Sequence, residues 1–179
     1  MQTETELMEF LPLGPEHYGL MRAWLEAPHV REWWGDPEEE FGYIRDMVEG
    51  RDTTRPFIIS LDGRPVGYIQ CWFIGHHQNE TWIADHPWLG ELPADAVGVD
   101  LSIGEEDLLS QGIGSAALAG FARGLFVQGY ATIIIDPDLA NARAVRAYSK
   151  AGFRPVPHLQ GRTGDTLIMQ YDPNANEAT

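Results

Sequence analysis

The chain has 179 residues, of which 44% are hydrophobic, and this length and composition fit one folded domain with its own core. It is strongly acidic, because 27 Asp and Glu stand against 12 Lys and Arg and give a formal net charge of −15. This balance excludes nucleic acid as an expected partner, since binding a phosphate backbone needs a basic surface. Cationic small molecules are compatible with it, although the same charge also serves solubility alone.

Cys71 is the single cysteine, so the chain forms no internal disulfide, and its apolar neighbours predict a core position. No apolar signal-peptide core and no run of transmembrane length occurs in the sequence. We therefore expect a cytoplasmic protein without a membrane partner, with a single domain over residues 1–173 and a polar tail over 174–179. The composition leaves a monomer and a homodimer open.

The N-terminal third predicts a strand followed by two helices. Residues 5–13 read as the strand, and the first helix begins at residues 14–16 and is ended by Pro28. Residues 29–36 are expected to form a loop or short turn, after which Pro37 suits the first position of the second helix. The positions expected on the buried sides of these helices are Tyr18, Met21, Trp24, Leu25, Phe41, Ile44 and Val48.

A hairpin follows, with strands over 56–61 and 64–73 joined by Asp62-Gly63, a pair suited to positive φ. Residues 75–94 are expected to form a long loop, and loops of that length are usually functional. Within it, the spacing of His76, His77 and His86 matches no standard metal site, and Trp82 and Trp88 fit anchors better than a substrate platform.

The second half predicts alternating strands and helices. Strands are expected over 96–103 and 131–135, the second buried on both faces, and helices over 112–128 and 141–151. Gly152 closes the last helix, and two further strands over 153–158 and 166–171 follow, joined by a polar turn.

Gly112 and Gly114 open the helix expected over 112–128. Because glycine lacks Cβ, a phosphate can approach the backbone there and accept from N–H groups between Gln111 and Ser115 at the positive end of the helix. An ordinary flexible turn is the alternative. Ser115 stands where an ATP-binding phosphate loop needs Lys, and the dinucleotide fingerprint lacks its third glycine.

Asn141 and Tyr148 lie on one face of the last predicted helix, about 10 Å apart along its axis. Asn141 fits a helix cap after Asp136-Pro137, and Tyr148 fits a core position. The functional alternative for Tyr148 is a phenol that donates a proton to a leaving group.

Together these elements resemble the Gcn5-related N-acetyltransferase superfamily over most of the chain. The resemblance rests on Gly112-Ile-Gly114 and on the ending that runs from Asn141 through Ala144 and Tyr148 to Gly152-Phe153. It implies an α+β fold, in which helices flank a mixed, mostly antiparallel sheet with a splayed strand pair. It also implies acetyl-CoA as co-substrate and no metal. Two positions depart from the family: Leu109 replaces a usual Arg or Gln, and Ser110 a common glycine.

Four stretches are most similar to the aminoglycoside 6′-N-acetyltransferases of this superfamily, in the same order: 32–35, 65–70, 98–100 and 136–144. The resemblance weakens over 75–96, where acceptor specificity is expected. It implies an acceptor that is a primary amine of a polycationic small molecule.

The resemblance also implies residue roles. Asp100 would take or orient the proton of the substrate ammonium group, and Tyr148 would be the general acid for the coenzyme A thiolate. Asp136 would hold other amines of the substrate. The expected coenzyme contacts are Leu101, Ser102, Ile103, Gln111, Gly112, Ile113, Gly114, Ser115, Asn141, Ala144 and Tyr148, and the expected acceptor contacts are Trp33, Trp34, Tyr68, Asp100 and Asp136.

Three alternatives remain at this stage. A related acyltransferase for hydroxylysine-type siderophore precursors shares the layout, but that group tends to carry His where this chain has Asp100. Acetylation of a protein N-terminus is also open. A non-catalytic module that only binds acyl-CoA comes from a different class, and the presence of both Asp100 and Tyr148 argues against it.

Overall fold

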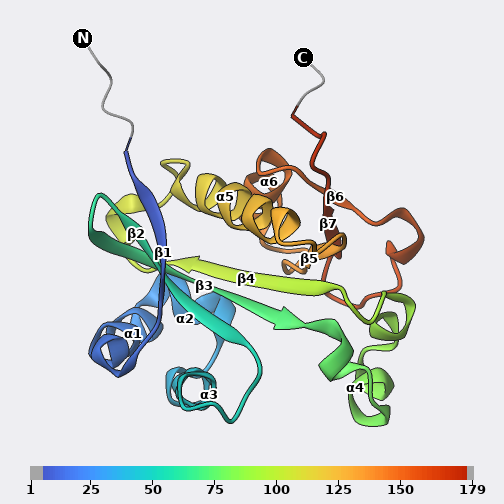
Figure 1. The fold of residues 1–179 in the computed structure, drawn as a ribbon, viewed down its shortest axis with the longest axis horizontal. Coiled ribbons are helices and arrows are strands. Elements are labelled where there is room, and N and C mark those ends of the chain that lie inside the picture. The colour runs from blue at the N-terminus through green and yellow to red at the C-terminus, as the bar shows by residue number, and fades with distance from the viewer. Residues whose placement is uncertain (1–5, 177–179) are drawn as a thin grey trace. The chain divides into compact units, whose positions relative to one another are not determined.

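The computed structural model describes residues 6–176, and its seven strands form one sheet in the order β1-β2-β3-β4-β5-β7-β6. β1 pairs antiparallel with β2, β4 pairs parallel with β5, and β7 pairs antiparallel with both β5 and β6. The α-helices lie in the connections β1–β2, β3–β4, β4–β5 and β5–β6 (Figure 1). The predicted α+β class with a mixed, mostly antiparallel sheet is therefore confirmed.

The strands are β1 (Met8–Pro12), β2 (Arg55–Leu61), β3 (Arg64–Phe73), β4 (Val97–Ile103), β5 (Ile133–Ile135), β6 (Phe153–Pro155) and β7 (Met169–Tyr171). The α-helices are α1 (Tyr18–Glu26), α2 (Pro28–Trp34), α3 (Pro37–Val48), α4 (Glu80–Asp85), α5 (Ile113–Val127) and α6 (Ala142–Lys150). Short 3-10 turns, η1 to η5, cover Pro15–His17, Ile74–His77, Pro87–Glu91, Glu106–Leu108 and Pro157–Leu159.

The chain packs as two compact units. The first contains the described residues up to Gln70 together with Leu101–Ala117, and the second contains Cys71–Asp100 together with the described residues from Leu118 onward. β3, β4 and α5 each contribute residues to both units. A single domain over residues 1–173 stays a prediction.

The core of the first unit lies between three helices and the strands β2 and β3. The helices α1, α2 and α3 pack against one another beside the strands of this unit (Figure 1). The buried residues include Met21, Trp24, Leu25, Val30, Phe41, Ile44, Ile58 and Tyr68, with Tyr18 and Val48 partly buried against them. The buried faces predicted for the helices that correspond to α1 and α3 are thus confirmed.

Residues 29–36 do not form the expected loop, because most of them belong to α2, which begins at Pro28. Proline disfavours helix at the residue before it but suits the first helical position, so Pro28 both ends α1 and begins α2. The prediction used only the first of these effects. For the next helix the prediction is confirmed: Pro37 begins α3, and the Asp36 carboxylate caps it by accepting from the Glu39 N–H at 3.0 Å.

The β2–β3 hairpin is confirmed, with φ of 51° at Asp62 and 79° at Gly63 in its turn. The strand predicted over 5–13 is shorter, and Thr5 lies outside the described residues. The buried position of Cys71 is also confirmed.

Residues 75–94 are not a structureless loop. The Asn79 side chain caps α4, and the Gln78 amide donates to the carbonyls of Leu89 and Leu92 at 2.9 and 2.8 Å. Trp88 is 6% exposed and belongs to the core of the second unit, which confirms it as an anchor. The capping residue and the proline at the start of η3 were the local signals that the prediction missed.

The other strands of the second unit are shorter than expected. β5 is fully buried, as predicted, but covers only Ile133–Ile135. Pro157 turns the chain into η5 and thereby ends β6 at Pro155, while β7 begins only at Met169. The helix over 141–151 is confirmed as α6, and Gly152 follows it with φ of 102°.

Candidate active site

The acidic pair consists of Asp100 on β4 and Asp136 directly after β5, and these two strands are parallel neighbours. The register pairs Val97 with Ile133 and Gly98 with Ile134. Continuing that register two residues further places Asp100 opposite Asp136, and a side-chain hydrogen bond joins the two carboxyl groups. Residues 36 positions apart in the sequence thus meet through strand pairing.

Two carboxyl groups at hydrogen-bond distance do not both ionise readily. Burial, the charge of Asp100 and the hydrogen bond to Asp100 raise the pKa of Asp136 well above its ordinary value. The pair therefore keeps one proton at a pH where isolated carboxyl groups have lost theirs.

Tyr148 stands near this pair, on the second turn of α6. Burial is the main reason why the pKa of Tyr148 is raised, and the charges of Asp100 and Asp136 add to it. The phenol consequently keeps its proton, which is the state required of a proton donor. Of the residues that the sequence predicts as functional, Asp100, Asp136 and Tyr148 are brought together.

Asn141 is the cap of α6, since its side-chain oxygen accepts from the Ala144 N–H at 3.1 Å. The structural alternative for Asn141 is therefore confirmed. A coenzyme contact through Asn141 or Ala144 stays a prediction.

Trp72 of β3 explains the glycine at position 98 in the same unit. A Cβ built on Gly98 would lie 2.1 Å from the indole of Trp72, so only glycine lets the ring cover the β4 backbone there. Side chains two residues apart on a strand point to the same face of the sheet. The Trp72 ring therefore covers the face of β4 on which the side chain of Asp100 projects.

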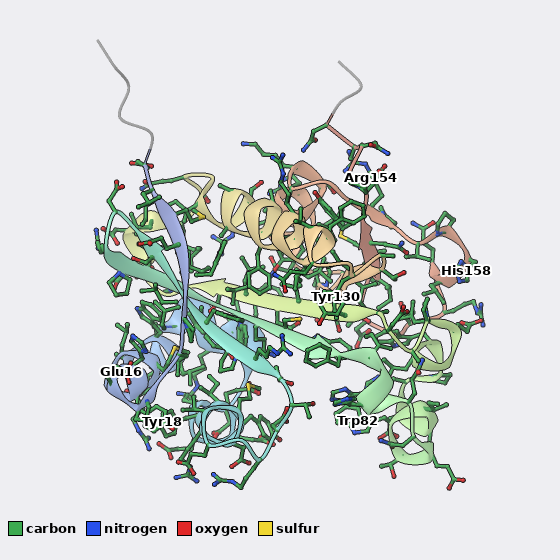
Figure 2. All side chains as sticks on the ribbon, viewed as in Figure 1. Glu16, Tyr18, Trp82, Tyr130, Arg154 and His158 are labelled. Carbon is green, nitrogen blue, oxygen red and sulfur yellow. The ribbon has the colours of Figure 1, made fainter. Side chains whose placement is uncertain are left out.

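An aromatic row runs from Trp72 through the segment that precedes β4. The ring centroids of His77 lie 5.1 Å from Trp72 and 5.0 Å from Trp82, and His86 lies 6.0 Å from Trp82 and 6.2 Å from Trp88. Trp82 stands on α4 (Figure 2) and is 46% exposed, whereas Trp88 is buried. The row therefore combines an anchored end with an exposed ring.

The glycine turn, residues 110–115, lies in the first unit and includes the first residues of α5. Ser110 and Gly112 have φ of 61° and 81°, a left-handed conformation that glycine adopts most readily. The first N–H groups of α5 have no acceptor within the helix and are available to an anion. The open space around the Cα of Gly112 fits such an approach of a phosphate.

The end of β4 is held from α2 within the same unit. His29 donates through Nε2 to the carbonyl oxygen of Ile103 at 2.9 Å, and its Nδ1 is buried without a partner. Leu101 is buried, while Ser102 and Ile103 are partly buried. No local sequence signal predicts the contact between His29 and Ile103, because these residues are far apart in the chain.

The predicted acceptor residues of the first unit differ in exposure. Trp33 is 38% exposed, and Trp34 packs edge-on against Tyr68 with ring centroids 5.6 Å apart. Tyr68 is 1% exposed, and its hydroxyl donates to Gln70 Oε1 at 2.5 Å. Tyr68 thus supports Trp34 from the core, and direct contact of these residues with a substrate stays a prediction.

Within residues 6–176, no group of three or more His, Cys, Asp or Glu side chains gathers as metal ligands do. Along the same stretch, no helix has the length and apolar character needed to cross a bilayer.

Comparison with known proteins places the chain in a family. Residues 15–160 match the model of the acetyltransferase (GNAT) domain, so the chain belongs to that family of acetyltransferases. The superfamily expected from the sequence is confirmed.

Individual similar proteins have names that state a substrate class. The aminoglycoside N(6′)-acetyltransferase type 1 of Klebsiella pneumoniae is 29% identical over 94% of this chain and 85% of its own length. A solved structure of the acetyltransferase AAC(6′)-Ib with paromomycin and acetyl-CoA superposes with a TM-score of 0.77 at 25% identity, over 96% of this chain and 97% of the other. The same enzyme with coenzyme A and kanamycin gives a TM-score of 0.77 at 25% identity, over 97% and 99%.

Proposed function

We propose that this protein transfers the acetyl group of acetyl-CoA to the 6′ amine of an aminoglycoside or a closely similar polycationic amine. The observation that carries the proposal is the acidic pair beside Tyr148 in a chain of the acetyltransferase (GNAT) family. The similar enzymes act on aminoglycosides, as their names state. A cytoplasmic location belongs to the same proposal.

Asp100 performs the first step. A primary amine is protonated at neutral pH and has no lone pair with which to attack a thioester. The Asp100 carboxylate binds the ammonium group and takes one of its protons, either directly or through water. The freed lone pair then forms the C–N bond at the acetyl carbonyl carbon.

Tyr148 performs the last step. As the carbon–sulfur bond breaks, the phenol proton of Tyr148 passes to the departing sulfur, and the excess proton of the new amide nitrogen leaves to solvent. Without a bound acceptor, burial raises the pKa of Tyr148, and the charges of the two carboxyl groups raise it further. A bound cation offsets their charge, so Tyr148 becomes a better donor once the acceptor is in place.

The glycine turn is proposed to bind the coenzyme. Backbone N–H groups at the start of α5 would donate hydrogen bonds to the pyrophosphate oxygens, which requires neither Lys nor a metal. Gln111 to Ser115 would serve it through the backbone, so the replacement of the usual basic residue by Leu109 is tolerated.

A thiol-release screen with acetyl-CoA tests the proposal. Kanamycin, a linear polyamine and hydroxylysine are offered in turn, and coenzyme A release is followed. We expect rapid release with kanamycin and slow release with the other two. Preference for hydroxylysine would favour the siderophore-precursor alternative, and binding of acetyl-CoA without release would favour the non-catalytic one.

A further inference from the structure

We infer that the acidic pair is a proton-bearing switch: Asp136 carries a proton in the empty protein, donates it as a hydrogen bond to Asp100, and releases it when a polycationic acceptor binds. This inference rests on the proposed function and concerns the same site. It assigns to Asp136 a change of state that converts it from a support of Asp100 into a carboxylate that holds a second ammonium group.

The geometry supplies the first argument. The parallel pairing of β4 with β5 brings both side chains to one place, and a hydrogen bond joins them. A hydrogen bond between two carboxyl groups needs one proton, because two carboxylates have only acceptors to offer. The bond itself therefore requires at least one proton on the pair.

The surroundings supply the second argument. Asp100 faces Asp136 from β4, and Tyr148 faces both from α6. The charges that act on Asp136 and Tyr148 come from carboxyl groups, so the empty site favours keeping the proton. A second ammonium group beside Asp136 reverses this preference, because a cation at about 4 Å stabilises the ionised form of that acid.

The consequence concerns substrate choice. An acceptor with one ammonium group is served by Asp100 alone, and the pair keeps its proton. An acceptor with a second ammonium group gains a salt bridge to Asp136 at the cost of one proton released to solvent. The switch therefore favours diamines over monoamines, and increasingly so as the pH rises.

Calorimetric titration of kanamycin into the full-length protein tests the inference. Titrations in two buffers of different ionisation enthalpy, at one near-neutral pH, give the number of protons exchanged per ligand bound. Asp136→Asn keeps an N–H donor toward Asp100 but has no proton to lose. Asp95→Asn is the matched control, because Asp95 is an exposed carboxylate of the same unit.

We expect the wild type and Asp95→Asn to release about one proton more per kanamycin than Asp136→Asn does. The comparison between variants removes any proton exchanged by kanamycin itself. Equal proton counts in the wild type and Asp136→Asn, or no binding of kanamycin to the wild type, would overturn the inference.

The outcome is distinguishable from failure of the proposed function. Thiol release with equal proton counts removes the switch and leaves the enzyme. A proton difference without any thiol release keeps the switch and removes the acetyl transfer.

Discussion

The acidic pair and the glycine turn are built in opposite ways. The pair consists of two side chains from separate parts of the chain: Asp100 lies on β4, and Asp136 directly follows β5, the strand with which β4 pairs. The glycine turn consists of six consecutive residues whose backbone conformation matters more than their side chains. A site made of backbone is encoded locally, whereas a site made of facing side chains depends on strand register.

The acidic pair and the glycine turn also carry opposite electrostatic charge. The pair concentrates negative charge and suits a cationic acceptor, while the start of α5 presents the positive end of a helix and suits a phosphate. Substitutions in the pair should therefore change chemistry and acceptor binding, and substitutions in the turn should change backbone stability and coenzyme binding.

The largest effect is expected for Asp100→Asn. Loss of the base should lower kcat/KM for kanamycin on the order of 100- to 10,000-fold, because the ammonium group is no longer deprotonated. Steady-state thiol release measures it, with Asp95→Asn as the control that should keep wild-type rates. A rate within threefold of the wild type would show that Asp100 is not the base.

The next effect is expected for Tyr148→Phe. Removal of the phenol proton should lower kcat roughly 100-fold, since the thiolate must leave unassisted. The KM for acetyl-CoA should stay within about twofold, because the ring is kept. Parallel losses of turnover and of coenzyme affinity would assign Tyr148 to binding instead.

Gly112→Ala should break the turn while leaving the pair intact. The residue has φ of 81° with open space around it, so the cost is conformational, roughly 1–2 kcal/mol of stability. Thermal unfolding should show this loss, and the KM for acetyl-CoA should rise more than the KM for kanamycin.

Ser110→Gly is the matched change in the same turn. Ser110 already holds φ of 61°, so glycine should relieve strain and preserve coenzyme binding. If both variants behaved alike, the left-handed backbone would not be what the turn requires.

The smallest effect is a pH dependence of stability carried by Asp136. Its pKa is raised on folding, so the folded chain binds more protons than the unfolded chain between the two pKa values. Stability must then fall as the pH rises through that window, and Asp136→Asn should remove this fall. At neutral pH we expect the variant to unfold about 3 °C or more above the wild type, which thermal unfolding across pH measures. An unchanged pH dependence would contradict the raised pKa.

The same contrast explains what could be predicted from the sequence. The hairpin at Asp62-Gly63, the helix closed by Gly152 and the turn at Gly112 are local signals, and all three are present in the structure. Asp100 and Asp136 could each be named through family resemblance. Their hydrogen bond could not, because it follows from how two strands align.

The two predictions of secondary structure that differ from the structure also have physical reasons. The sequence pattern predicts that Pro28 ends a helix, whereas in the structure it also begins α2. The sequence predicts a long loop before β4, whereas this segment contains α4 and η3, and Gln78 and Asn79 hold it through side-chain hydrogen bonds to the backbone. Both cases show single polar or cyclic residues deciding local structure where hydrophobic periodicity is weak.

The most direct test of the central claim is the product formed from kanamycin and acetyl-CoA. Mass spectrometry and NMR of the wild-type reaction should show one acetyl group on the 6′ nitrogen, and Asp100→Asn should form almost none. An acetyl group on another nitrogen would contradict the assigned position. No acetylated product from the folded wild type would contradict the proposed function itself.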